Sequence, residues 1–315
     1  MAVDSHKLYY KQNRLKQLRA FCTAAQTGSI SRAAEQLFLS QPSISLLVKA
    51  LEKDLNNSLF ERKGPKIQLT DEGRILLDLA LPLVEGMEKL SETFDERCNN
   101  EITGHLNIAA GESTILYILP DIIKRFKNKF PHILIQLSNV TGRDGLALLR
   151  AGEVDFAVGS MLDVPDDIIY IPTLTFDPML ITPLNHPLAK KKNVTLEDIS
   201  PYGLILPPRH LTTWRMVELV FQQHHVQYKV AMEAGGWEVI KKYVALGHGV
   251  SIVTSNCLTG KEKLVSIPLN KYFPKRDYGI VVRRGKFISP VARRFFELMD
   301  KNTLDILYAG KSNQA

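Results

Sequence analysis

A short segment near the N-terminus combines small alanines, a serine cap and a polar helix start. Ala33 and Ala34 precede Leu37, and after Ser40 a second helical pattern begins that carries Pro42 in its first turn. Small residues allow one helix to lie close against the next, Ser is a favoured N-cap, and Pro is tolerated in the first helical turn. The spacing therefore predicts a helix-turn-helix, whose second helix places its N-terminal residues near base edges in the major groove of DNA.

The residue types at the start of this second helix suit the recognition of bases. Gln41 can pair with adenine, while Ser43 and Ser45 are short groups that both donate and accept hydrogen bonds. Basic side chains and the first N–H groups of a following helix can bind phosphate. The predicted DNA-binding residues are Ser31, Arg32, Gln41, Pro42, Ser43, Ser45, Lys49, Arg62, Lys63, Lys66 and Thr70.

The distribution of charge favours DNA over the alternative of a plain αα-hairpin in a helical bundle. Residues 1–70 hold eleven Lys and Arg against five Asp and Glu, so +6 of the total net charge of +7 lies in this segment. A basic segment on a near-neutral body is typical of a head that binds a polyanion. Residues 62–66, between two apolar stretches, predict a small basic hairpin or wing.

In the C-terminal two thirds, small and hydroxyl residues recur where predicted strands give way to helices. Residues 111–114, 159–160, 210–213 and 235–237 each lie at such a junction. Helix N-termini attract anions through free N–H groups and the helix dipole, although plain N-capping also explains any one of these segments. Four of them in one fold predict a shared site for a small anionic effector in a cleft. The predicted effector-binding residues are Ser113, Thr114, Ser160, Thr212, Thr213 and Trp237.

No spacing in the sequence supports catalysis or metal binding. His224 and His225 are adjacent and cannot share a helix face as two metal ligands do. Cys22, Cys98 and Cys257 form neither a disulfide framework nor a paired-cysteine motif, although a redox role for Cys98 or Cys257 stays open beside the interpretation as incidental thiols. Nucleophile elbow, zinc-protease and phosphate-loop motifs are missing from the sequence. We therefore expect no enzyme, no metal and no cofactor apart from the effector.

The segment after the predicted wing has the pattern of one long helix with a broad apolar surface. Thr70 is its expected cap, and the helix is expected over residues 71–99. Pro82 is expected to bend it or to sit where no N–H hydrogen bond is needed. Its apolar surface exceeds what a neighbour in the same chain could cover, so we expect it to pair with a second copy. The predicted dimerisation residues are Leu76, Leu79, Leu83, Met87 and Leu90.

From residue 104 onward, strand and helix patterns alternate, which predicts an α/β fold with a mixed sheet. We divide the chain into an N-terminal extension at 1–13, a winged helix-turn-helix at 14–70, the linker helix at 71–99, an effector-binding domain at 104–302 and a C-terminal tail at 303–315. In the effector-binding domain, we expect lobe I at residues 104–176 and 278–302, and lobe II at 177–277.

Two other classes of protein share parts of this pattern. An exported solute-binding protein would explain residues 104–302, but it needs a secretory signal and no DNA-binding head, and the first twelve residues are polar. An enzyme on an α/β scaffold would need a set of catalytic residues, and no such set is found in the sequence. Apolar runs of about 18–20 residues, which a membrane span needs, are also missing from the sequence. We therefore expect a cytoplasmic protein with no membrane partner.

Several stretches of the N-terminal third resemble the LysR-type transcriptional regulators. They are residues 29–37 (Ser-Ile-Ser-Arg-Ala-Ala-Glu-Gln-Leu), 39–45 (Leu-Ser-Gln-Pro-Ser-Ile-Ser), 51–52 (Leu-Glu), 59–62 (Leu-Phe-Glu-Arg) and 69–73 (Leu-Thr-Asp-Glu-Gly). The resemblance extends over about residues 14–302. It implies a bacterial winged helix-turn-helix regulator with a dimerising linker helix and a two-lobed effector domain like that of periplasmic binding proteins. It further implies a homodimer or homotetramer on double-stranded operator DNA, with RNA polymerase as a further partner.

Residues 185–189 and 239–250 are similar to the effector domain of this family, and the second stretch is most similar to its cysteine-regulon subgroup. This resemblance implies that anion-contacting hydroxyls lie near Ser113, Thr114, Ser160 and Thr212. Two positions depart from the pattern. Leu46 stands where many members carry Arg, and the acidic Glu112 would oppose an anion if it pointed into the site.

Overall fold

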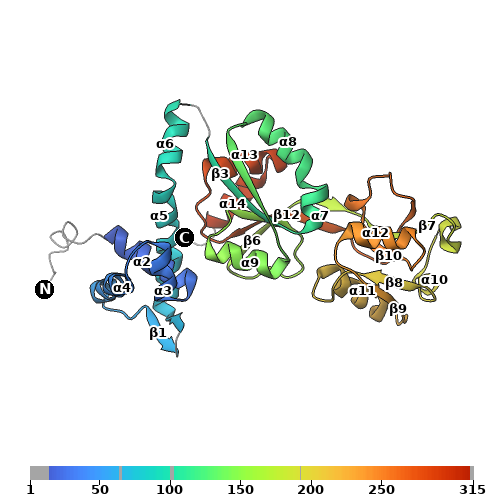
Figure 1. Ribbon diagram of the computed structural model, residues 1–315, viewed down its shortest axis with the longest axis horizontal. Helices are drawn as coiled ribbons and strands as arrows, with labels where there is room; N and C mark the ends of the chain where they lie inside the picture. The colour runs from blue at the N-terminus through green and yellow to red at the C-terminus, as the bar shows by residue number, and fades with distance from the viewer. Residues whose placement is uncertain (1–13, 64–65, 100–102, 192, 313–315) are drawn as a thin grey trace. The chain divides into compact units, whose positions relative to one another are not determined.

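The computed structural model describes residues 14–63, 66–99, 103–191 and 193–312 (Figure 1). The chain divides into two compact units. Of the described residues, those within 1–104, 150–153 and 283–292 form unit 1, and those within 105–149, 154–282 and 293–315 form unit 2. The predicted N-terminal extension and the tip of the predicted wing, residues 64–65, lie outside the described residues.

Unit 1 begins with the three helices that the sequence pattern predicts, because each change of direction has its own local signal. Ser29 and Ser40 are N-caps whose side chains accept hydrogen bonds from the backbone N–H groups of Arg32 and Ser43. Asn56, with a positive φ of 52°, ends the third helix in the left-handed conformation. The helices are α2 (Arg14–Thr27), α3 (Ile30–Gln36) and α4 (Gln41–Leu55).

Small side chains allow these helices to pack closely. Ala33 and Ala34 of α3 lie in one buried cluster with Ile44 and Val48 of α4, and Phe21 of α2 joins a second cluster. The predicted hairpin follows as β1 (Phe60–Lys63) and β2 (Lys66–Leu69), which pair antiparallel. The helix-turn-helix and the paired strands of the wing are therefore confirmed.

The linker differs from the prediction of one continuous helix over residues 71–99. Two helices are present, α5 (Asp71–Glu88) and α6 (Leu90–Asn99), with Lys89 as the C-cap of the first. Pro82 lies inside α5 and does not end it, and the break falls seven residues later. Thr70 caps α5 as expected, with its side chain accepting the N–H of Gly73 at 3.0 Å.

Lobe I, the first part of unit 2, is built on a five-stranded mixed sheet with the order β4-β3-β5-β12-β6. Strand β3 runs parallel to β5, whereas β12 runs antiparallel to β5 and sets Gly279 opposite Gly159. Its strands are β3 (Gly104–Ala110), β4 (Ile133–Asn139), β5 (Phe156–Gly159), β6 (Ile168–Phe176) and β12 (Arg276–Arg283). Its helices are α7 (Glu112–Tyr117), α8 (Leu119–Lys129), α9 (Gly142–Ala151), α13 (Pro290–Met299) and α14 (Thr303–Ser312).

Lobe II contains a three-stranded antiparallel sheet of order β10-β7-β11 and a parallel pair, β8 and β9. Its strands are β7 (Pro178–Pro183), β8 (Gly203–Leu206), β9 (Lys229–Glu233), β10 (Ser251–Thr254) and β11 (Leu264–Pro268). Its α-helices are α10 (Leu196–Ile199), α11 (Thr212–Gln223) and α12 (Trp237–Ala245), and two 3-10 turns are η1 (Pro187–Lys190) and η2 (Ser255–Cys257). The predicted mixed α/β architecture is confirmed.

Several local predictions were wrong or incomplete. The helical segment between β3 and β4 is divided at Ile118, shortly before Pro120 in the first turn of α8. Strands β6, β9 and β11 were not predicted, because their exposed or half-exposed residues do not form a clear apolar run. The expected C-terminal tail at 303–315 contains α14. Within the described residues, no helix is long and apolar enough to cross a membrane.

Candidate DNA-binding and effector-binding sites

The start of α4 presents the side chains that were expected to contact bases. Gln41 is exposed, and its amide oxygen accepts a 3.4 Å hydrogen bond from the hydroxyl of Ser31 on α3. This bond orients the amide and leaves its two N–H donors for another acceptor. The hydroxyls of Ser40 and Ser43 lie 2.8 Å apart, and Ser45, about one turn after Gln41, is half-exposed. The predicted base-contacting residues therefore lie together at one helix end.

Two interactions hold the wing and the start of α5 beside this helix. A carboxylate oxygen of Glu52 on α4 accepts the backbone N–H of Leu59 at 2.9 Å and that of Phe60 at 3.3 Å, where β1 begins. Thr70 donates its hydroxyl to the carbonyl oxygen of Ser58 at 2.7 Å. Because that donor is already used, a phosphate contact at Thr70 would involve the backbone N–H groups of α5 instead.

The structure describes the side chains of some of the remaining predicted DNA-binding residues. Arg32 and Lys49 are exposed, Pro42 lies in the first turn of α4, and Leu46 is 70% exposed. Arg62, Lys63 and Lys66 have backbones on β1 and β2, and their side chains lie outside what the structure describes. That these residues bind DNA stays a prediction.

One face of the linker helices carries large apolar side chains that are exposed in the single chain. Of the predicted dimerisation residues, Leu79, Leu83, Met87 and Leu90 are between 49% and 66% exposed. Leu76 differs, since it packs against the buried cluster that contains Phe21 and Leu51. Ile75 and Phe94, each 62% exposed, extend the stripe at helical spacing and were not predicted. The stripe is defined as Ile75, Leu79, Leu83, Met87, Leu90 and Phe94.

In unit 2, the four predicted junctions line the same cavity, whose volume is about 740 Å³. Lobe I contributes the loop after β3 and the end of β5, and lobe II contributes the starts of α11 and α12. Thr114 and Thr213 are buried in its wall. All the predicted effector-binding residues belong to its lining, namely Ser113, Thr114, Ser160, Thr212, Thr213 and Trp237. That they bind an effector stays a prediction.

Sequence reasoning missed the half-buried cation of this cavity, Arg276. Its Nε donates to Ser160 Oγ at 3.2 Å, and one Nη donates to Thr213 Oγ1 at 2.7 Å. Arg276 thus connects a hydroxyl of lobe I with one of lobe II. The apolar alternation of β12 extends back to Tyr278, and following it in the sequence would have brought Arg276 close to the end of β5.

The structure also locates Glu112, whose direction the sequence left open. Glu112 is the first residue of α7 and lines the cavity. Its carboxylate lies against Gly236, the N-cap of α12, where a Cβ atom would come within 2.8 Å of one oxygen. Gly236 has a φ of +83°, which also favours glycine. The acid therefore does point into the site, beside the positive end of α12.

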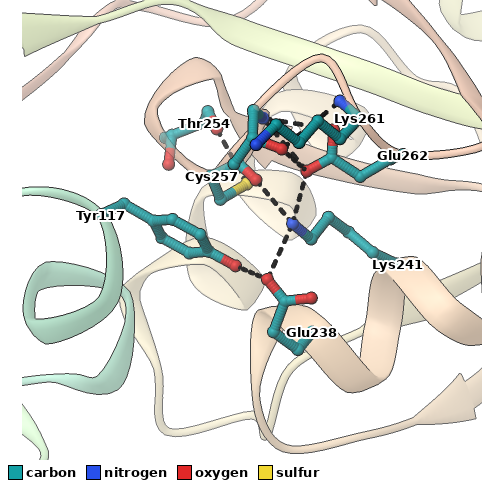
Figure 2. Close-up of polar contacts among 8 residues, drawn as sticks. Tyr117, Glu238, Lys241, Thr254, Cys257, Lys261 and Glu262 are labelled. Atoms are coloured by element: carbon teal, nitrogen blue, oxygen red, sulfur yellow. Dashed lines mark hydrogen bonds and ion pairs between the residues drawn. The ribbon is translucent and has the colours of Figure 1, made fainter.

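Helix α12, whose first residue lines the cavity, is anchored by the buried ammonium of Lys241 (Figure 2). Its Nζ donates to the carbonyl oxygen of Cys257 and to Glu262 Oε1, each at 2.8 Å, and lies 2.9 Å from Glu238 Oε1. Tyr117 of α7 donates its hydroxyl to Glu238, so this network also joins lobe I to lobe II. The anchor holds in place the helix whose first residues line the cavity.

Burial and hydrogen bonding have opposite effects on the pKa values of Lys241 and Glu262. Burial alone would lower the pKa of Lys241, but hydrogen bonds to Glu262, Glu238 and Tyr117 outweigh it and raise that pKa. Burial would likewise raise the pKa of Glu262, yet hydrogen bonds from Lys241 and Thr259 lower it to about 2. Both groups are therefore charged at neutral pH, as the ion pair requires.

Two of the three thiols are buried. Cys22 and Cys257 are buried, and burial is the main cause that raises the pKa of each thiol to about 12. Cys98 is exposed. In the described ranges, no group of three or more His, Cys, Asp or Glu side chains could hold a metal ion.

Comparison with known proteins gives matches along most of the chain. Residues 15–74 match the family model described as "Bacterial regulatory helix-turn-helix protein, lysR family", and residues 99–303 match "LysR substrate binding domain". The RuBisCO operon transcriptional regulator of Allochromatium vinosum is 29% identical over 90% of this chain and 95% of that protein. The HTH-type transcriptional regulator cbl of Escherichia coli is 28% identical over 87% of this chain and 88% of that protein.

The solved structures agree on the fold. A full-length OxyR variant from Pseudomonas aeruginosa superimposes with a TM-score of 0.67 at 23% identity, covering 93% of this chain and 94% of that one. At this identity the likeness concerns the fold alone.

Proposed function

The chain belongs to the LysR family of transcriptional regulators, with a DNA-binding helix-turn-helix and an effector-binding domain, and we propose on that premise how its parts act. The start of α4 reads operator bases, the wing and nearby basic residues bind phosphate, and the exposed stripe of the linker helices pairs two chains. A small effector with an anionic group binds in the cavity of unit 2 and modulates DNA binding. The alternative of an exported solute-binding protein is wrong, because the head matches the regulator family.

The observation that carries this proposal is that four separate segments of the chain converge on one cavity. Four segments that are separated by up to 124 residues supply hydroxyl, small and aromatic residues that line it, including Ser113 and Trp237. Arg276 adds a half-buried positive charge that bridges both lobes. A cavity that joins two lobes and holds a few convergent polar groups is the usual form of a small-molecule site.

Further parts of the proposal follow from the family. The chain acts in the cytoplasm, where operator DNA is accessible, assembles as a homodimer that pairs into a homotetramer, and contacts RNA polymerase. It catalyses no reaction and requires no cofactor besides the effector. The named regulators of Allochromatium vinosum and Escherichia coli support the assignment as a regulator and not an enzyme.

The test combines DNA binding with ligand binding on the full-length protein. Promoter fragments selected from a genomic library are titrated by fluorescence anisotropy with and without metabolites that raise the melting temperature. A Ser113→Ala and Thr212→Ala double variant should lose the ligand response and retain basal DNA affinity. Calorimetry with the confirmed effector decides the site, because undiminished affinity of the double variant would show that the cavity is not where it binds.

A further inference from the structure

We propose that the effector is a zwitterion of the amino-acid class, with its carboxylate on Arg276 and its ammonium group on Glu112. This inference rests on the proposed function, since it assumes that the cavity is the effector site. It goes further by assigning the ligand both charges and by giving each charge a named partner on the cavity wall.

Arg276 has the donors that a carboxylate needs. A guanidinium carries five N–H donors, and two of them are used by the hydroxyls of Ser160 and Thr213. No carboxylate of the described part of the chain forms an ion pair with Arg276. Three donors are thus available on a half-buried cation, and paired donors of this kind match the two oxygens of a carboxylate.

Glu112 provides the opposite charge at another point of the wall. Its carboxylate lies against Gly236 at the start of α12, and it has no ion pair or hydrogen bond with any other described residue. The negative charge that the N-terminus of α12 favours is therefore already present. An anionic group of the ligand would be repelled there, so it belongs at Arg276. Glu112 would instead bind a positively charged hydrogen-bond donor of the ligand.

The other charged groups of the lining do not change this polarity. Arg143, Asp163, His210 and Arg215 line the cavity, but all four side chains are exposed and are screened by water and salt. The less exposed charges are Arg276 and Glu112. A simple anion such as sulfate would pair with Arg276 and leave Glu112 without a counter-ion, whereas a zwitterion pairs with both. The departure of Glu112 from the cysteine-regulon pattern then reflects a different ligand.

The experiment measures binding to the full-length protein by thermal shift, followed by calorimetry on the hits. The probes are the twenty standard amino acids, their deaminated carboxylates, their decarboxylated amines, and sulfate at matched ionic strength. We expect at least one amino acid to bind more tightly than its carboxylate, its amine and sulfate. Arg276→Gln and Glu112→Gln should each weaken that binding by about 10- to 100-fold, the usual effect of one charge-assisted hydrogen bond.

Matched variants separate the site from general charge effects. Lys275→Gln removes one positive charge beside Arg276, where Lys275 pairs with Asp177, and Asp121→Asn removes an exposed acid from α8. Both should bind the amino acid as the unaltered protein does. Glu112→Gln should also bring the affinity of the deaminated carboxylate close to that of the amino acid. Melting temperatures without ligand verify that each variant is folded.

Three results would overturn the inference: no amino acid binds, sulfate or a simple carboxylate binds at least as tightly, or Glu112→Gln leaves the preference for the ammonium group intact. The proposed function has its own separate outcome. If a ligand of another class binds and the Ser113→Ala and Thr212→Ala double variant loses it, the zwitterion assignment fails and the effector site stands.

Discussion

Glu85 of α5 and Arg283 at the end of β12 form a buried ion pair, with Glu85 Oε1 2.8 Å from the guanidinium. The same carboxylate accepts Lys286 Nζ at 3.2 Å and the backbone N–H of Phe287 at 3.1 Å. One acid of the linker helix therefore satisfies three donors of the segment 283–292, which belongs to the same compact unit as the DNA-binding head.

Removing the charge of this acid should destabilise unit 1. Glu85→Gln leaves Arg283 buried without its counter-ion, and breaking a buried pair costs about 3–5 kcal/mol. Urea unfolding followed by far-ultraviolet circular dichroism should show an earlier transition. Glu88→Gln is the matched control, because Glu88 lies on the same helix and pairs with the exposed Arg19, a contact of about 0–1 kcal/mol. Equal midpoints for the two variants would contradict this prediction.

The apolar stripe of α5 and α6 should mediate dimerisation. Leu79 and Leu83 are 66% and 65% exposed in the single chain. Replacing either one with Asp puts a charge into the stripe, so the fold should be retained while dimerisation is lost. Light scattering should report monomers, and operator affinity should fall because each monomer contacts a single half-site. Dimers of unchanged stability in both variants would place the interface elsewhere.

The base-reading and phosphate-binding residues should respond differently to mutation. Gln41→Ala with Ser43→Ala should reduce the preference for operator over random duplex, because both side chains stand at the N-terminal end of α4. Arg62→Ala should instead weaken binding to every duplex and reduce the slope of log K against log salt by about one. Anisotropy titrations at several salt concentrations measure both effects. Full operator selectivity in the Gln41 and Ser43 double variant would exclude α4 as the reading helix.

The anchor of α12 should make unit 2 sensitive to acid. The pKa of Glu262 is lowered from 4.5 to about 2, so its stabilising contribution is complete above pH 4.5 and is lost as the pH falls toward 2. Glu262→Gln should lower the melting temperature at pH 7 and flatten its decline between pH 4.5 and 2. Asp121→Asn, on an exposed acid, is the control. A decline in the Glu262 variant as steep as in the unaltered protein would argue against the anchor.

The three thiols should differ sharply in reactivity. Cys98 is exposed, whereas Cys22 and Cys257 are buried and have pKa values raised to about 12, so few of their thiolates form at neutral pH. A disulfide reagent at pH 8 should modify one thiol per chain rapidly, and the other two only after unfolding. Rapid modification of Cys257 in the folded protein would contradict this prediction and support a redox role for Cys257.

Much of the DNA-binding head could be predicted from the sequence because its signals are local. Ser40 and Thr70 cap the helices that begin directly after them, and Ala33 and Ala34 determine how closely α3 and α4 pack. The hydroxyls of the effector cavity were also predictable, since each lies where a strand gives way to a helix. The break at Lys89 was not, because the apolar period continues across it.

The sequence by itself thus determined the head, the alternation of strands and helices, and the loops that line the cavity, because each depends on neighbours within a few residues. Only the tertiary structure decided which charged side chains line the cavity. Arg276 meets Ser160 across 116 residues, and Glu112 meets Gly236 across 124. Neither pairing leaves a periodic signal in the chain, since it arises from the register of β12 on β5 and from the packing of α7 beside α12.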